Sequence, residues 1–131
     1  MSVKKVFDTS NILRSLPYKA VTATVDKNFA GVDVDGKKYI KAGTLVAGKG
    51  GSIFDDRSKP VEENKTAPEG IVLYDADLSV DKTVSVLYAG EVWKEAVNGG
   101  TVDDAIKTAL PLVKFIAGIG GNALWVLFMT R

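Results

Sequence analysis

The chain has 131 residues, of which 46% are hydrophobic and 25% charged, a size and composition typical of one globular domain. It contains neither cysteine nor histidine. This excludes a disulfide framework, zinc sites built from Cys and His, and Ser–His or Cys–His catalytic pairs. The formal net charge of +1 argues against a nucleic-acid-binding protein, which needs an excess of basic residues on one face.

The first 17 residues are expected to form an extended N-terminal arm. They lack the long apolar stretch of a secretory signal, and the segment ends at Pro17. Its few apolar side chains are too sparse to fold alone, so we expect it to become ordered against a partner. Residues 18–131 are then expected to form a single β-rich domain.

The first half of that domain has the pattern of short strands separated by turns. Residues 18–25 alternate between polar and apolar side chains, as a half-buried strand does. The pair Asp35-Gly36 lies between β-prone residues and predicts a hairpin turn. A short strand follows over Thr44–Ala47, and the polar stretch 55–68 predicts a long exposed connection.

The second half adds strands and one helix. Strands are predicted over Ile71–Tyr74 and Thr83–Val92, which are rich in β-branched and aromatic residues. A helix is predicted over Val102–Leu110, with Thr101 as its N-cap, two acidic residues in its first turn and a proline directly after it. The predicted fold is therefore mainly β (α+β), a small β-barrel or β-tulip-like domain with one short helix.

The apolar run Leu110–Met129 has about the length of a bilayer span. It is interrupted by Pro111, Lys114, Asn122 and three glycines, which do not suit a continuous spanning helix. We therefore expect a buried strand over Leu112–Ile116, a glycine turn, and a final strand over Ala123–Met129, with no membrane partner.

Three motifs carry a possible chemistry. Gly43–Lys49 fits the spacing of a phosphate-binding loop, but Gly50 occupies the position of the metal-binding Ser or Thr, which favours a glycine turn. Two aspartate pairs could ligate calcium and two glutamate pairs could act as acid and base, yet neither arrangement has a recognisable site motif. We therefore assign no catalytic, cofactor-binding or metal-binding residue. The acidic pairs are Asp55 with Asp56, Asp75 with Asp77, Glu62 with Glu63, and Glu91 with Glu95.

The stretch Glu69–Ile116 resembles the head decoration proteins of tailed phages, the lambda-type capsid-stabilising family. The resemblance is carried by "EGIVLYDADLS", a strand ending in an acidic corner, by "KTVSVLYAGEVWKEAV", a strand containing Ala89-Gly90, and by "DDAIKTALPLVKFI". More loosely, "KKYIKAGTLVAGKGGSIFDD" is similar to the hairpin region of that family. It is the order of these segments that carries the resemblance.

The resemblance implies a non-enzymatic protein that binds the outside of the assembled major capsid protein shell as a homotrimer at local threefold positions, without a cofactor. Its location would be the virion surface, and the host cytoplasm before assembly. Two alternatives remain: another virion component, such as a head-fibre base or a tail or connector protein, and a carboxylate-based enzyme or small ligand-binding domain. The residues expected to contact the capsid or another subunit are Val6, Ile12, Leu13, Leu16, Trp93 and Trp125.

Overall fold

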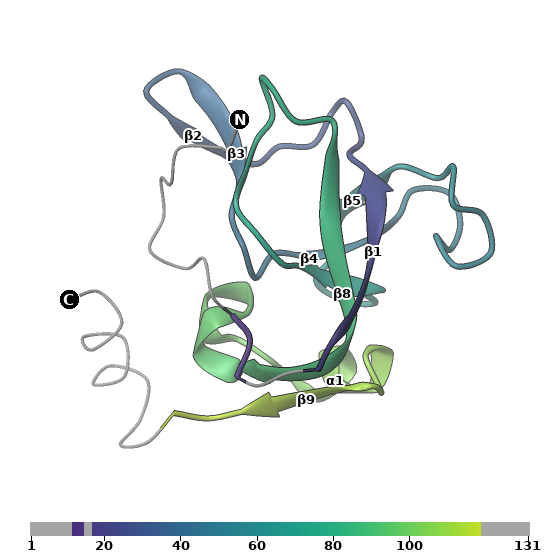
Figure 1. The fold of residues 1–131 in the computed structure, drawn as a ribbon, viewed down its shortest axis with the longest axis vertical. Helices are drawn as coiled ribbons and strands as arrows, with labels where there is room; N and C mark the ends of the chain where they lie inside the picture. The colour runs from purple at the N-terminus through teal and green to yellow at the C-terminus, as the bar shows by residue number, and fades with distance from the viewer. Residues whose placement is uncertain (1–11, 15–16, 119–131) are drawn as a thin grey trace.

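The computed structural model describes residues 12–14 and 17–118, which form two mainly antiparallel sheets, one α-helix and two short 3₁₀ turns (Figure 1). The larger sheet has the strand order β1-β8-β6-β4-β5, and β9 pairs in parallel with the end of β8. Its strands are β1 (Lys19–Thr24), β4 (Leu45–Gly48), β5 (Val61–Glu63), β6 (Gly70–Val72), β8 (Thr83–Trp93) and β9 (Val113–Ile116).

The smaller sheet is formed by β2 (Val32–Val34), β3 (Lys37–Ile40) and β7 (Ala76–Asp77), in the order β2-β3-β7. Its hairpin turn is the predicted one. Asp35 and Gly36 both have left-handed backbone angles, with φ of 53° and 81°, as the turn between two closely paired strands requires. Aspartate and glycine tolerate this conformation better than bulky residues, so the sequence determines the turn directly.

The long strand β8 runs through the middle of the structure and uses both of its edges (Figure 1). Its first half lies between β1 and β6, and its second half lies between β9 and Leu13, which forms an antiparallel bridge to Val92. Gly90 separates the two halves with φ of 140°. A Cβ at Gly90 would lie 3.1 Å from the Cβ of Tyr18, so a larger residue there would force the neighbouring chain away.

Consecutive residues of the central strands face opposite sides of the larger sheet, and both sides are buried. Leu45, Ile71 and Leu87 belong to one hydrophobic cluster, which also contains residues from the helix and the N-terminal segment. Their neighbours Val46, Val72 and Val86 belong to a second cluster, beneath the smaller sheet. Burial on both faces explains why these strands are continuously apolar and do not alternate.

The α-helix α1 (Asp104–Ala109) follows the 3₁₀ turns η1 (Lys94–Ala96) and η2 (Asn98–Gly100). The helix is confirmed, but its predicted cap is wrong: the carboxylate of Asp103, and not Thr101, accepts a hydrogen bond from the Ile106 N–H at 3.0 Å. Both residue types cap helices well, so their order in the sequence could not decide between them. Ile106 and Leu110 attach the helix to the first hydrophobic cluster.

The N-terminal boundary differs from the expected one. Ile12 has no exposed surface, and its C=O accepts a hydrogen bond from the Trp93 N–H at 2.9 Å. The Arg14 N–H donates to the Glu91 C=O, also at 2.9 Å. Residues 12–14 are therefore part of the domain and not of a separate arm, and the boundary at residue 17 does not hold for them.

Two further expectations are modified and a third is not tested. The connection 55–68 contains the strand β5, which a single buried residue, Val61, joins to the core. The strand expected to be buried over Leu112–Ile116 is β9, whose residues after Val113 are partly or fully exposed. The final strand predicted over Ala123–Met129 lies outside the described residues.

The mainly β, α+β class with one short α-helix is confirmed. The barrel or β-tulip shape stays a prediction, because the edge strands β1 and β5 do not pair along a ladder: Val25, directly after β1, forms one parallel bridge with Val61 of β5. The Asp26 N–H donates to the Val61 C=O at 3.0 Å beside this bridge. The larger sheet, as described, is open.

The burial of Ile12 predicts a large stability cost for its truncation. Ile12→Ala should lower the free energy of unfolding by about 2–5 kcal/mol, because it removes buried methyl groups and leaves a cavity. Val80→Ala, at a side chain that is 60% exposed, is the control and should change it by less than about 0.5 kcal/mol. Urea unfolding followed by tryptophan fluorescence measures both, and equal effects would show that Ile12 is not part of the core.

The corner after β7 predicts a pH dependence. The hydroxyl and backbone N–H of Ser79 donate to Asp77 Oδ1 at 2.6 and 2.9 Å, and these bonds lower the pKa of the Asp77 carboxyl below its ordinary value of 3.8. The stabilisation is therefore present above that value and is lost as the pH falls through the lowered one. Ser79→Ala should destabilise the protein at pH ~7 and much less at pH ~2. If the difference from the wild type were the same at both pH values, packing and not the carboxylate would explain the role of Ser79.

Candidate interaction surfaces

Most of the segment with phosphate-loop spacing, Gly43–Lys49, is a strand of the larger sheet. Residues Leu45–Gly48 are the central strand β4, and the backbone N–H groups around it already have partners within the protein. A phosphate would need these N–H groups to be free and to converge on one point. The bonds run from Gly43 N to Val72 O (2.8 Å), from Gly48 N to Glu69 Oε1 (2.8 Å) and from Lys49 N to Pro60 O (2.7 Å).

The acidic residues considered in the sequence mostly hold turns and loops. Asp75 Oδ1 accepts the Ala42 N–H at 2.7 Å, and Asp56 accepts the hydroxyl and N–H of Ser58, which lowers the pKa of the Asp56 carboxyl. Glu95 accepts the N–H of Gly118. Within residues 12–14 and 17–118, no three His, Cys, Asp or Glu side chains are grouped so that they could hold a metal ion.

Three of the six predicted contact residues lie together. Ile12 and Leu13 pair with the end of β8, next to Trp93. The guanidinium of Arg14 lies 5.9 Å from the centre of the Trp93 ring and forms an ion pair of 2.8 Å with Glu91. We call residues 12–14 with Glu91 and Trp93 the N-terminal anchor. Ile12 is buried in the subunit's own core, whereas Leu13 and Trp93 are half-buried. Val6, Leu16 and Trp125 lie outside the described residues.

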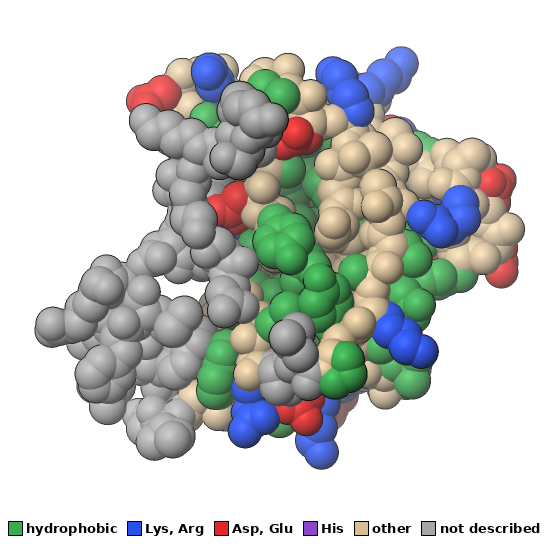
Figure 2. Space-filling model, viewed as in Figure 1, with side chains coloured by type: hydrophobic (Ala, Val, Ile, Leu, Met, Phe, Trp, Pro, Cys, Tyr) green, Lys and Arg blue, Asp and Glu red, His purple; other side chains and the backbone are tan. Residues whose placement is uncertain are grey.

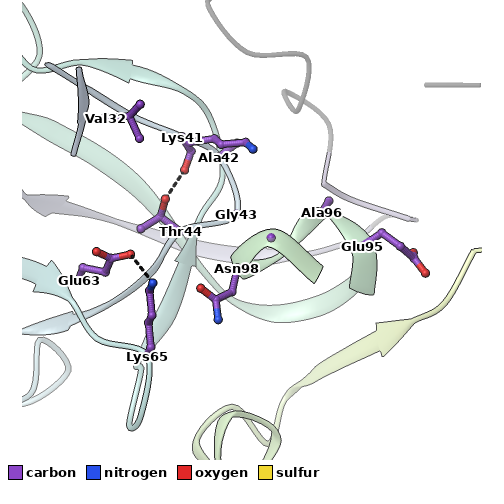
Figure 3. Close-up of a pocket in the computed structure, with 11 residues that line it drawn as sticks. Val32, Lys41, Ala42, Gly43, Thr44, Glu63, Lys65, Glu95, Ala96 and Asn98 are labelled. Carbon is purple, nitrogen blue, oxygen red and sulfur yellow. Dashed lines mark hydrogen bonds and ion pairs between the residues drawn. The ribbon is translucent and has the colours of Figure 1, made fainter. Parts of the chain in front are cut away.

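A hollow of about 270 Å³ lies where residues 41–44, the end of β5 and the turns η1 and η2 approach one another (Figure 3). Within it, the Thr44 hydroxyl donates to the Lys41 C=O at 2.6 Å, and Lys65 pairs with Glu63 at 3.9 Å. Figure 3 shows Glu63 and Lys65 directed toward each other and Glu95 on the opposite side. The charged groups therefore do not converge on one point, as those of a catalytic site would.

A second hollow, of about 260 Å³, has a different character. The rings of Phe54 and Tyr88 meet edge to face with their centres 5.3 Å apart, and Leu112 borders them. Phe54 is 48% exposed and Leu112 is 65% exposed. We call Phe54, Tyr88, Pro111 and Leu112, with the neighbouring Pro68, Glu69 and residues 109–110, the apolar hollow. Exposed apolar groups gathered around a depression are typical of protein interaction sites.

The position of Phe54 depends on a buried neighbour and on Glu69. Ile53 is 1% exposed and anchors the turn, and Glu69 Oε1 accepts the N–H groups of Gly48 and Ile53 at 2.8 and 3.1 Å. The Ser52 hydroxyl accepts the N–H of Phe54 itself at 3.1 Å. These bonds connect the glycine loop 48–51 to the strand β6 and fix the direction in which Phe54 leaves the turn.

The sequence interpretation missed the apolar hollow. It placed Phe54 in no element and Leu112 in a buried strand, and it assigned a contact role to neither. A single phenylalanine in an otherwise polar turn was the available signal, because such a residue is either a buried anchor or an exposed contact. Figure 2 shows that one face of the molecule also gathers hydrophobic side chains at its middle, with charged side chains toward its periphery.

Among the described residues, no helix is long and apolar enough to cross a membrane. In comparisons with known proteins, no family model and no curated protein matches the chain.

The bonds of Glu69 generate a prediction. Glu69→Ala should lower the free energy of unfolding by about 1.5–3 kcal/mol, because it removes the acceptor for two N–H groups, and should loosen residues 48–54. Glu69→Gln keeps a side-chain oxygen and should cost less. Hydrogen exchange of the Gly48 and Ile53 amides measures the local effect. Equal protection of these amides in the wild type and in Glu69→Ala would contradict it.

Proposed function

We propose that this protein is a decoration protein of a tailed-phage capsid, which binds the outside of the assembled major capsid protein shell and stabilises it. It acts as a homotrimer at local threefold positions and without a cofactor. Its location is the outer surface of the virion, and the host cytoplasm before assembly. The chemistry of this role is binding alone, and the protein is not an enzyme.

The N-terminal anchor is the observation that carries the proposal. Residues 12–14 are attached to the end of β8, so the preceding 11 residues start from a fixed point beside the half-buried Trp93. A segment that starts from a rigid sheet can bind a neighbouring protein with a smaller entropic cost than one on a loose tether. Leu13 and Trp93 lie at this point and are the described residues that we propose to contact the shell.

The resemblance to lambda-type decoration proteins supports the same reading. Its three segments supply β6 and β7, then β8, and then α1 and β9; of these, β6, β8 and β9 belong to the larger sheet and β7 to the smaller one. The formal net charge of +1 and the exposed apolar groups suit a protein that attaches by packing. Three linked subunits would gain avidity, since binding of the first makes the other contacts intramolecular.

The test uses expanded capsid shells that lack the protein. Wild-type protein should sediment with the shells, raise the temperature at which they fall apart, and appear by electron microscopy at local threefold positions. Absence of binding would overturn the proposal. Density at a single vertex or in the tail would also overturn it, and would point to a fibre base or a tail component.

Deletion of residues 2–11 should weaken shell binding and leave the domain folded, because Ile12 and its contacts remain. The matched control carries a scrambled sequence at residues 2–11, with the same length and composition. Both variants should unfold at the urea concentration of the wild type. Full shell binding by the deletion variant would show that these residues do not contact the shell.

A further inference from the structure

The apolar hollow and the point where the chain leaves the described residues lie at opposite ends of β9. Leu112, in the hollow, directly precedes the first residue of β9, and Gly118 follows its last residue by two positions. The N–H of Gly118 is held by both carboxylate oxygens of Glu95 at 3.0 Å. Figure 1 shows β9 leading away from the neighbourhood of α1.

The hollow is too small and too apolar for an ordinary small-molecule site. Its volume of about 260 Å³ is below the roughly 300–1,000 Å³ of typical ligand pockets. The carboxylate of Glu69, its one charged group, is already bonded to two N–H groups. A hollow with these properties fits large apolar side chains from another polypeptide segment.

The chain itself contains a segment of that chemistry. Residues 123–129, Ala-Leu-Trp-Val-Leu-Phe-Met, are seven consecutive apolar residues within the 13 residues that follow Gly118. Transfer of large apolar side chains from water to a buried site is favourable, because it removes their surface from water. Residues 118–122, which include three glycines, would supply a short connection between β9 and this apolar segment.

We propose that the apolar hollow of one subunit receives residues 123–129 of a neighbouring copy of this chain. Because the acceptor hollow precedes β9 and the donor segment follows it in the chain, the contact would be heterologous, with different surfaces on the two partners. Heterologous contacts close into a ring when the rotation between subunits permits. The inference rests on the self-association within the proposed function and not on capsid binding.

Disulfide trapping tests this contact directly, since the wild-type chain has no cysteine. Leu112→Cys and Leu127→Cys are made as separate variants, mixed, and oxidised. A disulfide between the two different chains is expected on a non-reducing gel. Val80→Cys replaces Leu112→Cys in the control mixture, because Val80 is similarly exposed, at 60% against 65%, and does not line the hollow. That mixture should give no comparable product.

The double variant Leu112→Cys/Leu127→Cys distinguishes a segment bound to its own chain from a segment bound to a neighbouring copy. If the segment occupied the hollow of its own chain, this variant would form an internal disulfide at the mass of one chain, 14.0 kDa, and the mixture of single variants would give none. That result, or the absence of any disulfide, would overturn the inference.

Sedimentation of cysteine-free protein provides the second measurement. Leu112→Asp should convert the oligomer to single chains, whereas Val80→Asp should leave it intact, with both variants showing the wild-type circular dichroism spectrum. An unchanged oligomer in Leu112→Asp would contradict the inference. Shell binding of the wild type is measured in parallel: failure of trapping with normal shell binding overturns the inference alone, and trapping without shell binding overturns the capsid role alone.

Discussion

The strand β8 is the element on which the larger sheet depends, because three of its other strands and the N-terminal segment pair with it. Along its first half it completes the ladders of β1 and β6, and along its second half it holds β9 and Leu13. Its inward residues supply both hydrophobic clusters. Where β8 exchanges one pair of neighbours for the other, the backbone next to Tyr18 passes close to β8. Gly90 permits this, since its lack of a Cβ leaves room for Tyr18.

The sequence predicted the elements whose signals are local. The Asp35-Gly36 turn, the β-branched residues of β8 and the proline after α1 each act within a few residues, so the hairpin, the strand and the helix end could be inferred. The strand β5 could not be inferred, because a single buried valine in a polar stretch produces no hydrophobic periodicity. Its pairing with β4 is what holds these residues in a strand. Ile12 is a similar case, since the partner that buries it is about 80 residues away in the sequence.

The candidate sites were harder to predict for a related reason. Carboxylates that might have held a cation or moved a proton are instead acceptors for backbone N–H groups at Ala42, Ser79 and Gly118. A domain with many short strands has many turns, and each turn leaves N–H groups that require an acceptor. Aspartate and glutamate meet this requirement at positions that a sequence cannot distinguish from binding sites. The exposure of Phe54 and Leu112 depends on how distant segments meet, and it has no local signal.

The two surfaces that carry the proposals lie at opposite ends of the pairing between β8 and β9. The N-terminal anchor joins β8 at Val92 and Trp93, and the apolar hollow contains Tyr88 and the residues that precede β9. Both are attached to the same strand, so their separation is set by the sheet and not by a flexible connection. The two proposed contacts, one with another copy and one with a shell, would both benefit from this fixed spacing. If both contacts form, each further subunit would bind in the same orientation as the one before it.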